Sequence, residues 1–281
     1  MRVKKAYVFL VILLLLPTCG AWGVSIGTFN MEYFTLSGKQ RYTAEDCRYL
    51  AEKIIASGVQ VVALQEVDND KTMERFVSTF LPGWRFSGID TPSRQDRYFI
   101  WHPQEIALEK PVELMDAHKR INWKGKDCLL FRRPPLKGVF REKHTQKTFT
   151  MVNVHLRSWG VKNASDTLAA LAMNNGLRQA QIVQLNQHVR EITGPLFILG
   201  DFNSVAVPGA NFKLFPLSGD VTYDDLHCTI DHIGYANLWP HINWRIFTVE
   251  TAIPRRSSRR RQHPDHDMVV LSLSGPCAES P

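Results

Sequence analysis

The chain has 281 residues, of which 44% are hydrophobic and 22% are charged, and its formal net charge is +7. This composition excludes a disordered or fibrous chain and fits one large globular domain with a substantial buried core.

The first residues have the layout of a secretory signal peptide. Basic residues near the start precede an apolar run over residues 6–16, which is too short to span a bilayer comfortably. We predict cleavage after Gly23, which removes residues 1–23, and export to the periplasm or the medium. Lipid attachment through Cys19 is the less favoured alternative. Because this cleavage removes three basic and no acidic residues, the net charge falls from +7 to +4.

The first half of the mature chain alternates short apolar strands with amphipathic helices. We expect, in order, a strand over 24–30, a helix over 43–57, a strand over 59–64, a helix over 71–80 and a strand over 96–101. Thr43 followed by Asp46 is typical of a helix N-cap. Residues 104–126 show weak periodicity and should contain strand and loop. Pro134 and Pro135 indicate a sheet edge or a break between strands.

The second half continues with strands around one long helix. We expect a strand over 149–156, a helix within 165–192, and further strands over 196–201, 229–235 and 268–273. Side chains alternate along an extended backbone, so Asp201 and Asn203 should point the same way while Phe202 turns toward the core. No internal repeat or long linker is evident, and residues 24–281 are therefore expected to form one domain.

Four cysteines remain after the predicted cleavage: Cys47, Cys128, Cys228 and Cys277. In an oxidising compartment they allow three different two-bridge pairings, and the sequence does not choose between these pairings and free, buried thiols. Neither a Cys-x-x-Cys pair nor a Cys/His cluster is present, which argues against a zinc site.

Polar side chains suited to metal binding and proton transfer stand at or near the ends of the expected strands. They are Asn30, Glu66, His155, Asp201, Asn203, Asp231, Asp265 and His266. Carboxylate and amide oxygens suit Mg²⁺ or Mn²⁺. A histidine that is held by a carboxylate has a fixed tautomer and raised basicity, so it can take a proton from water.

Six short blocks around these residues resemble, in the same order, the motifs of the endonuclease/exonuclease/phosphatase superfamily, which includes deoxyribonuclease I. The blocks are Thr28-Phe29-Asn30, Leu64-Gln65-Glu66, Val154-His155-Leu156, Gly200-Asp201-Phe202-Asn203, Ile230-Asp231-His232-Ile233 and Asp265-His266-Asp267. The resemblance implies a four-layer α/β sandwich, in which two packed, mostly antiparallel sheets are flanked by helices. It places the site at one rim of the sheets.

The resemblance also implies metal ligands and a cofactor. Glu66 would be the main metal carboxylate, and Asn30 and Asp265 would help to hold the ion or its waters. The ion would be Mg²⁺ or Mn²⁺.

The catalytic roles are implied in the same way. His266 would be the general base that activates water, oriented by Asp231. Asp201 and Asn203 would position that water and the phosphate. His155 would hydrogen-bond a phosphate oxygen and stabilise the developing charge.

Further positions resemble the family beside the site. Asp96 stands where an acidic residue, usually a glutamate, orients the second histidine, and Arg133 stands where an arginine before a proline contacts phosphate. Pro264 replaces a serine that the family usually has, which could shift the loop but removes no ligand or base.

A basic run leads directly into Asp265 and His266. Its last members, Arg259, Arg260 and Arg261, are expected to attract a polyanion to the site, with binding that weakens as salt rises.

Taken together, these features predict an exported, metal-dependent endonuclease that hydrolyses phosphodiester bonds of DNA with little sequence preference. We expect a monomer without stable membrane insertion. The alternative is a phosphodiesterase or phosphatase that acts on a phospholipid headgroup, similar to sphingomyelinases or inositol-phosphate phosphatases. The chain lacks a Trp-Cys-Asp-Arg block and an evident apolar hairpin for insertion, which argues against that alternative. A catalytically inactive binding module is a third possibility, but none of the residues that catalysis needs is missing.

Overall fold

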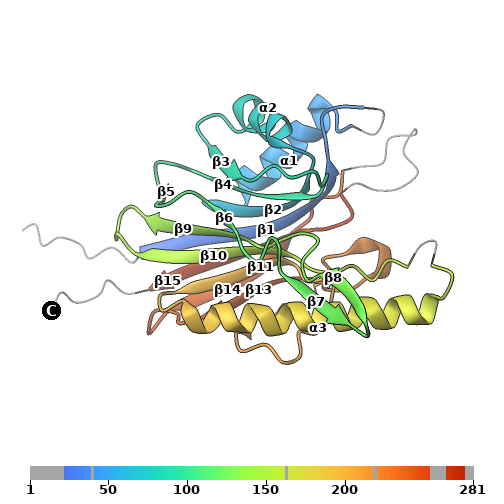
Figure 1. Cartoon of the computed structure of the whole chain (residues 1–281). Coiled ribbons are helices and arrows are strands. Elements are labelled where there is room, and N and C mark those ends of the chain that lie inside the picture. The colour runs from blue at the N-terminus through green and yellow to red at the C-terminus, as the bar shows by residue number, and fades with distance from the viewer. Residues whose placement is uncertain (1–21, 39–40, 162–163, 218–219, 254–263, 276–281) are drawn as a thin grey trace, which may run out of the picture.

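The computed structural model describes residues 22–38, 41–161, 164–217, 220–253 and 264–275. Within these ranges two β-sheets pack face to face, and helices cover their outer faces (Figure 1). Helices α1 (Ala44–Ala56) and α2 (Asp70–Phe80) lie on the first sheet, and α3 (Thr167–Glu191) lies on the second. The predicted four-layer α/β sandwich is confirmed.

The first sheet has six strands in the order β14-β15-β1-β2-β4-β3. Their bounds are β1 Trp22–Phe34, β2 Val61–Val67, β3 Arg85–Gly88, β4 Asp96–Trp101, β14 Asn243–Val249 and β15 Met268–Gly275. Strands β1 and β2 are parallel, and the other neighbours are antiparallel. The sequence did not predict β14, an edge strand whose first three residues are exposed.

The second sheet has the order β12-β13-β11-β10-β9-β5, and β6 pairs with β9. Its strands are β5 Ile106–Leu108, β6 Glu113–Leu114, β9 Leu136–Glu142, β10 Thr148–His155, β11 Leu196–Asp201, β12 Lys213–Leu214 and β13 Asp231–Ala236. Strands β10 and β11 are parallel. A separate hairpin joins β7 (Arg120–Trp123) and β8 (Lys126–Leu129), and a 3₁₀ turn covers Asp224–Leu226. Pro134 and Pro135 separate β8 from β9, so the expected break is present.

Alternation along β1 builds two cores at once. Val24 and Ile26 lie in the core between the sheets, whereas Phe29 and Met31 lie in the core under α1 and α2. Successive side chains of a strand point to opposite faces, so one short apolar segment holds two layers together.

The helices follow the patterns that predicted them. At α1, the Thr43 side chain accepts a hydrogen bond from the Asp46 N–H at 3.2 Å, and the Asp46 carboxylate accepts one from the Thr43 N–H at 2.8 Å. This reciprocal capping box satisfies donors that the first turn leaves unpaired. On α3, the expected stripe of Ile182, Leu185 and Val189 packs against the second sheet.

A buried polar contact joins the two sheets. Gln65 of β2 donates a hydrogen bond from Nε2 to Oδ1 of Asn153 on β10, at 2.8 Å. Asn153 in turn donates to the backbone carbonyls of Leu64 and Tyr98, at 2.9 and 3.1 Å. Gln65 is next to Glu66, and Asn153 is two residues before His155. The hydrogen bond between Gln65 and Asn153 therefore fixes the ends of β2 and β10, which carry these predicted site residues.

Cys47, Cys128 and Cys228 are free thiols, and Cys277 lies outside the described residues. None of the two-bridge pairings that the sequence allowed is therefore formed. The predicted signal peptide over residues 1–23 falls almost entirely outside the described residues. Within the part of the chain that the structure covers, no helix has the length and apolarity needed to cross a membrane.

Gly200, in β11, should tolerate no side chain. Its φ is +143°, and a β-carbon there would lie 1.9 Å from the carbonyl oxygen of Val154 on the parallel strand β10. We predict that Gly200→Ala lowers the free energy of unfolding by at least about 2 kcal/mol, measured by urea denaturation. Gly194, just before the same strand, has nothing within 4 Å of a β-carbon. Gly194→Ala should therefore stay within about 0.5 kcal/mol of the wild type, and equal losses in the two variants would contradict this account.

Candidate active site

Neighbouring strands of the second sheet hold polar residues in one row. His155 ends β10, Asp201 ends β11 and Asp231 begins β13, and Asp201 is the register partner of both others. Register partners lie side by side on one face of a sheet. All of them are almost completely buried, so the row forms a polar edge closed off from bulk water.

Asn30 of β1 connects this row to the first sheet. Its Nδ2 atom donates a hydrogen bond to Oδ2 of Asp201 at 3.1 Å and lies 3.3 Å from Nε2 of His266. Its Oδ1 atom accepts a hydrogen bond from the N–H of Glu32 at 3.0 Å, where β1 passes through two residues with positive φ, Glu32 and Tyr33. The Asn30 amide is thus held at both ends.

His266 and Asp231 form an imidazole–carboxylate pair. Nδ1 of His266 lies 2.8 Å from Oδ2 of Asp231, and Nε2 lies 3.7 Å from Oδ1 of Asp265. Burial lowers the pKa of His266, but the charge and hydrogen bond of Asp231, with Asp201 and Asp265 nearby, outweigh burial and raise it to about 10. Without a bound cation, His266 is therefore protonated at neutral pH.

Asp201 lies at the centre of the cluster. Oδ1 accepts the backbone N–H of Asn203 at 2.7 Å, and Oδ2 accepts the side-chain amide of Asn203 at 2.9 Å. Burial raises the pKa of Asp201 to about 7; Asp231 adds to this rise, and the positive charges of His266 and Arg133 oppose it. Near neutral pH Asp201 can therefore gain or lose a proton.

His155 lies between two carboxylates. Its Nε2 atom is 3.3 Å from Oδ2 of Asp201 and 3.6 Å from Oε1 of Glu66. Burial lowers the pKa of His155 well below its ordinary value, and the positive charges of Arg133 and Arg97 add to that effect. His155 is accordingly neutral, and its buried Nδ1 atom has no hydrogen-bond partner among the described residues.

Glu66 is placed by an irregularity in β2. Its φ is +61°, and the register between β2 and β4 shifts around it. Oε2 accepts the N–H of Tyr33 at 3.1 Å, which leaves Oε1 beside His155. Burial raises the pKa of Tyr33, and the negative charges of Glu66 and Asp265 raise it further. Both carboxylates therefore lie close enough to act electrostatically on the Tyr33 hydroxyl.

The structure thus brings the predicted strand-end residues into one cluster. They are Asn30, Glu66, His155, Asp201, Asn203, Asp231, Asp265 and His266. As expected, Phe202 turns away into the core under α3. The individual chemical roles of these residues stay predictions.

Asp96 does not contact His155, contrary to the prediction. Its carboxylate accepts hydrogen bonds from the N–H and the hydroxyl of Thr91, at 2.9 and 2.6 Å. Thr91 lies in the loop before β4, so the short aspartate side chain closes this loop instead of reaching across to the histidine.

Arg133 borders the cluster. It donates hydrogen bonds to Oε1 of Gln95 at 3.0 Å and to the Leu156 carbonyl at 2.6 Å, and these bonds fix its guanidinium. Burial lowers the pKa of Arg133, and the carboxylates of Glu66 and Asp201 oppose that effect. The positive charge of Arg133 therefore stands next to the acidic cluster.

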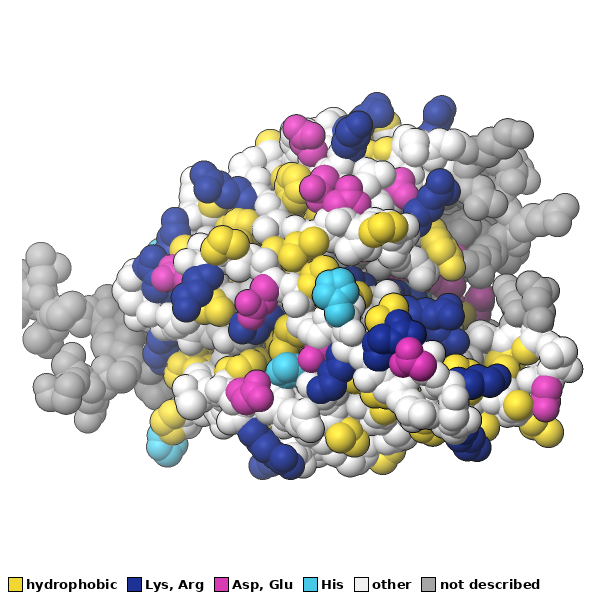
Figure 2. Space-filling model, in the orientation of Figure 1, with side chains coloured by type: hydrophobic (Ala, Val, Ile, Leu, Met, Phe, Trp, Pro, Cys, Tyr) yellow, Lys and Arg dark blue, Asp and Glu magenta, His cyan; other side chains and the backbone are white. Residues whose placement is uncertain are grey.

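The run that contains Arg259, Arg260 and Arg261 lies outside the described residues, so its place beside the site stays a prediction. Other basic side chains gather on this side of the molecule. Figure 2 shows a group of Lys and Arg side chains right of centre, in the region where Figure 1 draws the hairpin of β7 and β8 above helix α3.

Comparison with known families identifies the fold class independently. A family model described as the Endonuclease/Exonuclease/phosphatase family matches residues 27–259. The chain belongs to this family. No curated protein sequence matches it significantly.

Solved structures of the family share the fold. The endonuclease/exonuclease/phosphatase from Bacteroides vulgatus is 15% identical and superposes with a TM-score of 0.65, covering 90% of this chain and 98% of that chain. D. rerio TDP2 complexed with single strand DNA product is 13% identical, with a TM-score of 0.60 over 89% of this chain and 98% of that chain. The human Nocturnin catalytic domain with bound sulfate anion is 16% identical, with a TM-score of 0.58 over 90% and 94% of the two chains.

Enzymes of this family generally use divalent metals, and the oxygen atoms of the cluster fit such an ion. Across the described ranges, no three His, Cys, Asp or Glu side chains are arranged to enclose a metal. Mg²⁺ does not require such an enclosure, because it usually keeps several waters and binds one or two carboxylates plus substrate phosphate. Glu66 offers a carboxylate, and Asn30 and Asp265 offer further hard oxygens. With a cation there, the pKa of His266 would fall, which favours its basic form.

Several residues that contact the cluster were not predicted from the sequence. Oε2 of Glu32 accepts the N–H of Asp265 at 3.1 Å, and the hydroxyl of Thr222 accepts the N–H of Asp231 at 3.1 Å. The ring of Tyr223 lies 4.8 Å from the ring of His266. Glu32 stands two residues after Asn30, a spacing that could have indicated a shared strand face, whereas the loop before β13 gives no such signal.

Replacing Asp231 should change the titration of His266. In Asp231→Asn the charge that most strongly raises the pKa of His266 is lost, so we expect the imidazole to titrate at clearly lower pH than in the wild type. NMR titration of the metal-free proteins measures this shift. Asp127→Asn removes a carboxylate that is exposed and pairs with Arg120, and it should leave the His266 titration where it is. The same His266 pKa in all three proteins would contradict the assigned pair.

Proposed function

We propose that this protein is a divalent-metal-dependent phosphodiesterase that hydrolyses nucleic acid, with DNA cleaved at internal positions and with little sequence preference. The observation that carries the proposal is the His266–Asp231 pair, 2.8 Å apart, inside the same cluster as Glu66 and His155. An oriented base beside a carboxylate suited to metal binding is the arrangement that phosphodiester hydrolysis requires.

His266 serves as the general base in this proposal. Asp231 holds Nδ1, so the other ring nitrogen, Nε2, faces the space beside Asn30 and Asp265. In its neutral form Nε2 can take a proton from an attacking water, and the positive imidazolium that results is stabilised by Asp231.

The other side of the cluster suits the phosphate and the leaving oxygen. His155 is neutral and Arg133 is positive, so both can stabilise negative charge on phosphate oxygens. Asp201 and Asn203, which are joined by two hydrogen bonds of 2.7 and 2.9 Å, can position the attacking water and the phosphate. The products would be a phosphomonoester and a free hydroxyl. A divalent cation held by Glu66, Asn30 and Asp265 would supply Lewis-acid polarisation of the phosphate.

Nucleic acid is the favoured substrate because of the charge around the cluster. Arginines, including Arg133, border it on the side of helix α3, and a polyanion can engage several of them at once. The D. rerio TDP2 structure contains a single strand DNA product, and the Nocturnin structure contains a sulfate anion, which supports an anionic ligand in this fold.

Turnover assays test this proposal. We expect the purified protein to nick plasmid DNA with Mg²⁺ or Mn²⁺, and a chelator to stop the reaction. His266→Ala should lower the rate by about 10²- to 10⁴-fold because it removes the base. His118→Ala, at an exposed position away from the cluster, should retain wild-type activity.

Parallel assays use RNA, sphingomyelin vesicles and a phosphoinositide under the same conditions. Turnover of either lipid without cleavage of DNA would overturn the proposed substrate. Nicking that persists in His266→Ala would overturn the proposed base.

We also propose that the chain is exported, on the strength of the basic start and apolar run within residues 1–23. Cleavage after Gly23 leaves β1 paired with β15 from Val24 onward, since Val24 is the register partner of Leu273.

Expression of the full chain in a bacterial host, with N-terminal sequencing of the periplasm and medium, tests the export proposal. Val24 should be the first residue of the mature form. Leu13→Arg interrupts the apolar run and should leave the protein unprocessed in the cytoplasm, whereas Cys19→Ser should be processed normally. Loss of processing in Cys19→Ser would instead indicate lipid attachment, and a cytoplasmic, uncleaved wild type would contradict export.

A further inference from the structure

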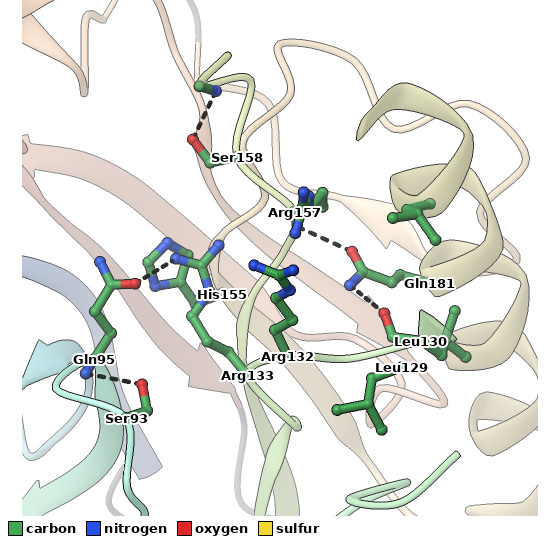
Figure 3. A pocket seen from close by; sticks show the side chains of 12 residues that line it. Ser93, Gln95, Leu129, Leu130, Arg132, Arg133, His155, Arg157, Ser158 and Gln181 are labelled. Atoms are coloured by element: carbon green, nitrogen blue, oxygen red, sulfur yellow. Dashed lines mark hydrogen bonds between the residues drawn. The ribbon is translucent and has the colours of Figure 1, made fainter. Parts of the chain in front are cut away.

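A cavity opens beside His155, on the side of helix α3. Its volume is about 490 Å³, within the range of small-molecule sites. Arg132, Arg133 and Arg157 line it together, and Gln181 of α3 forms part of its far wall. Figure 3 shows the arginine side chains turned toward the same space, with His155 beside Arg133.

The cavity carries concentrated positive charge. None of the residues that line it is acidic. Burial lowers the pKa of Arg157, and the nearby charge of Arg132 lowers it further. Arg132 makes no hydrogen bond or ion pair with any described residue. Guanidinium groups that line one cavity, with no carboxylate in its lining, favour an anion in the space they share.

The cavity is built in advance, because its central arginine is fixed by helix α3. Nε of Arg157 donates to Oδ1 of Asn174 at 2.7 Å, its backbone N–H donates to Oε1 of Gln181 at 3.0 Å, and its carbonyl accepts from Arg178 at 2.6 Å. The terminal nitrogens of Arg157 make no hydrogen bond to described residues and remain available to a ligand. A site held by packed helix residues needs little reordering when its ligand binds.

We propose that this cavity is a subsite for a second phosphate of the nucleic-acid strand, next to the phosphate that is hydrolysed. The inference rests on the proposed function, because His155 and Arg133 border both the catalytic cluster and the cavity. A strand whose one phosphate lies at His155 can place a neighbouring phosphate between Arg132 and Arg157.

The walls of the cavity suit a substrate of unrestricted sequence. Both polar ends of the Gln181 amide are already used, since Oε1 accepts from Arg157 and Nε2 donates to the Leu130 carbonyl at 2.8 Å. The other α3 residue that lines the cavity is the apolar Leu177. Phosphate contacts position a strand without reading its bases, so the subsite would strengthen binding with little base selection.

Kinetics with one-phosphate and many-phosphate substrates test the subsite. We compare bis(p-nitrophenyl) phosphate, which has one phosphate, with a short thymidylate oligonucleotide. In Arg132→Gln and Arg157→Gln, the KM for the oligonucleotide should rise about tenfold, as expected for the loss of one charge-assisted contact. The ratio of kcat/KM between oligonucleotide and diester should fall accordingly. Arg157→Lys should recover part of the loss.

Arg190→Gln is the matched control, because Arg190 is an exposed arginine of the same helix α3 outside the cavity. It should leave the ratio unchanged. Since Arg132 has no bonding partner among the described residues, Arg132→Gln should fold normally. If both cavity variants lower activity toward the two substrates equally, or leave the ratio unchanged, the subsite is refuted.

A binding measurement that needs no catalysis tests the subsite independently of the proposed function. Fluorescence anisotropy with a labelled thymidylate oligonucleotide and His266→Ala protein needs no turnover. Adding Arg132→Gln should weaken binding about tenfold and reduce the slope of log affinity against log salt by about 1. An unchanged affinity refutes the subsite even if the protein is a nuclease. The same pair of proteins is tested for binding to phosphatidylglycerol vesicles. If Arg132→Gln abolishes vesicle binding and leaves oligonucleotide binding intact, the cavity binds lipid and the inference is overturned.

Discussion

The hydrogen bond between Gln65 and Asn153 is the contact on which the geometry of the site depends. It joins the two sheets one residue before Glu66 and two residues before His155, and Asn153 also satisfies two backbone carbonyls of the first sheet. Buried amides that lose such partners cost about 1–3 kcal/mol each. Because a slip of one residue would turn side chains to the opposite face, this contact fixes the register in which both sheets present their polar ends.

Irregular backbone at the strand ends then aims the side chains. Glu32, Tyr33, Glu66 and Asn203 all have positive φ, a conformation that non-glycine residues adopt at a cost. Bulges of this kind end the ladder and redirect the next side chain. The regular part of the sandwich supplies the rigidity, and these few strained residues turn its rim into a cluster where His266, Asp201 and His155 lie close together.

The sequence predicted those parts of the molecule whose signals are local. Strand β4 has the predicted bounds, Asp96–Trp101, and the cluster residues follow apolar strands closely enough to be recognised. The prediction that Asp96 orients His155 was wrong. Whether the Asp96 carboxylate bonds to Thr91 or to His155 depends on the conformation of the loop before β4, which the sequence pattern does not reveal. Strand β14 was not predicted because it lies at the edge of its sheet and is only partly buried, so its short apolar pattern is a weak signal. The arginine cavity was missed because it forms between segments far apart in sequence, which meet only when α3 packs on the second sheet.

Among the described residues, the arginine cavity lies on the side of His155 that faces helix α3. An uneven row of anion-binding groups makes the two directions along a bound strand inequivalent, because the direction toward α3 places the neighbouring phosphate among Arg132, Arg133 and Arg157. A site of this shape would be indifferent to the order of the bases and yet sensitive to the 5′-to-3′ polarity of the backbone. Polarity would then decide which side of the scissile phosphate keeps the monoester after the cut.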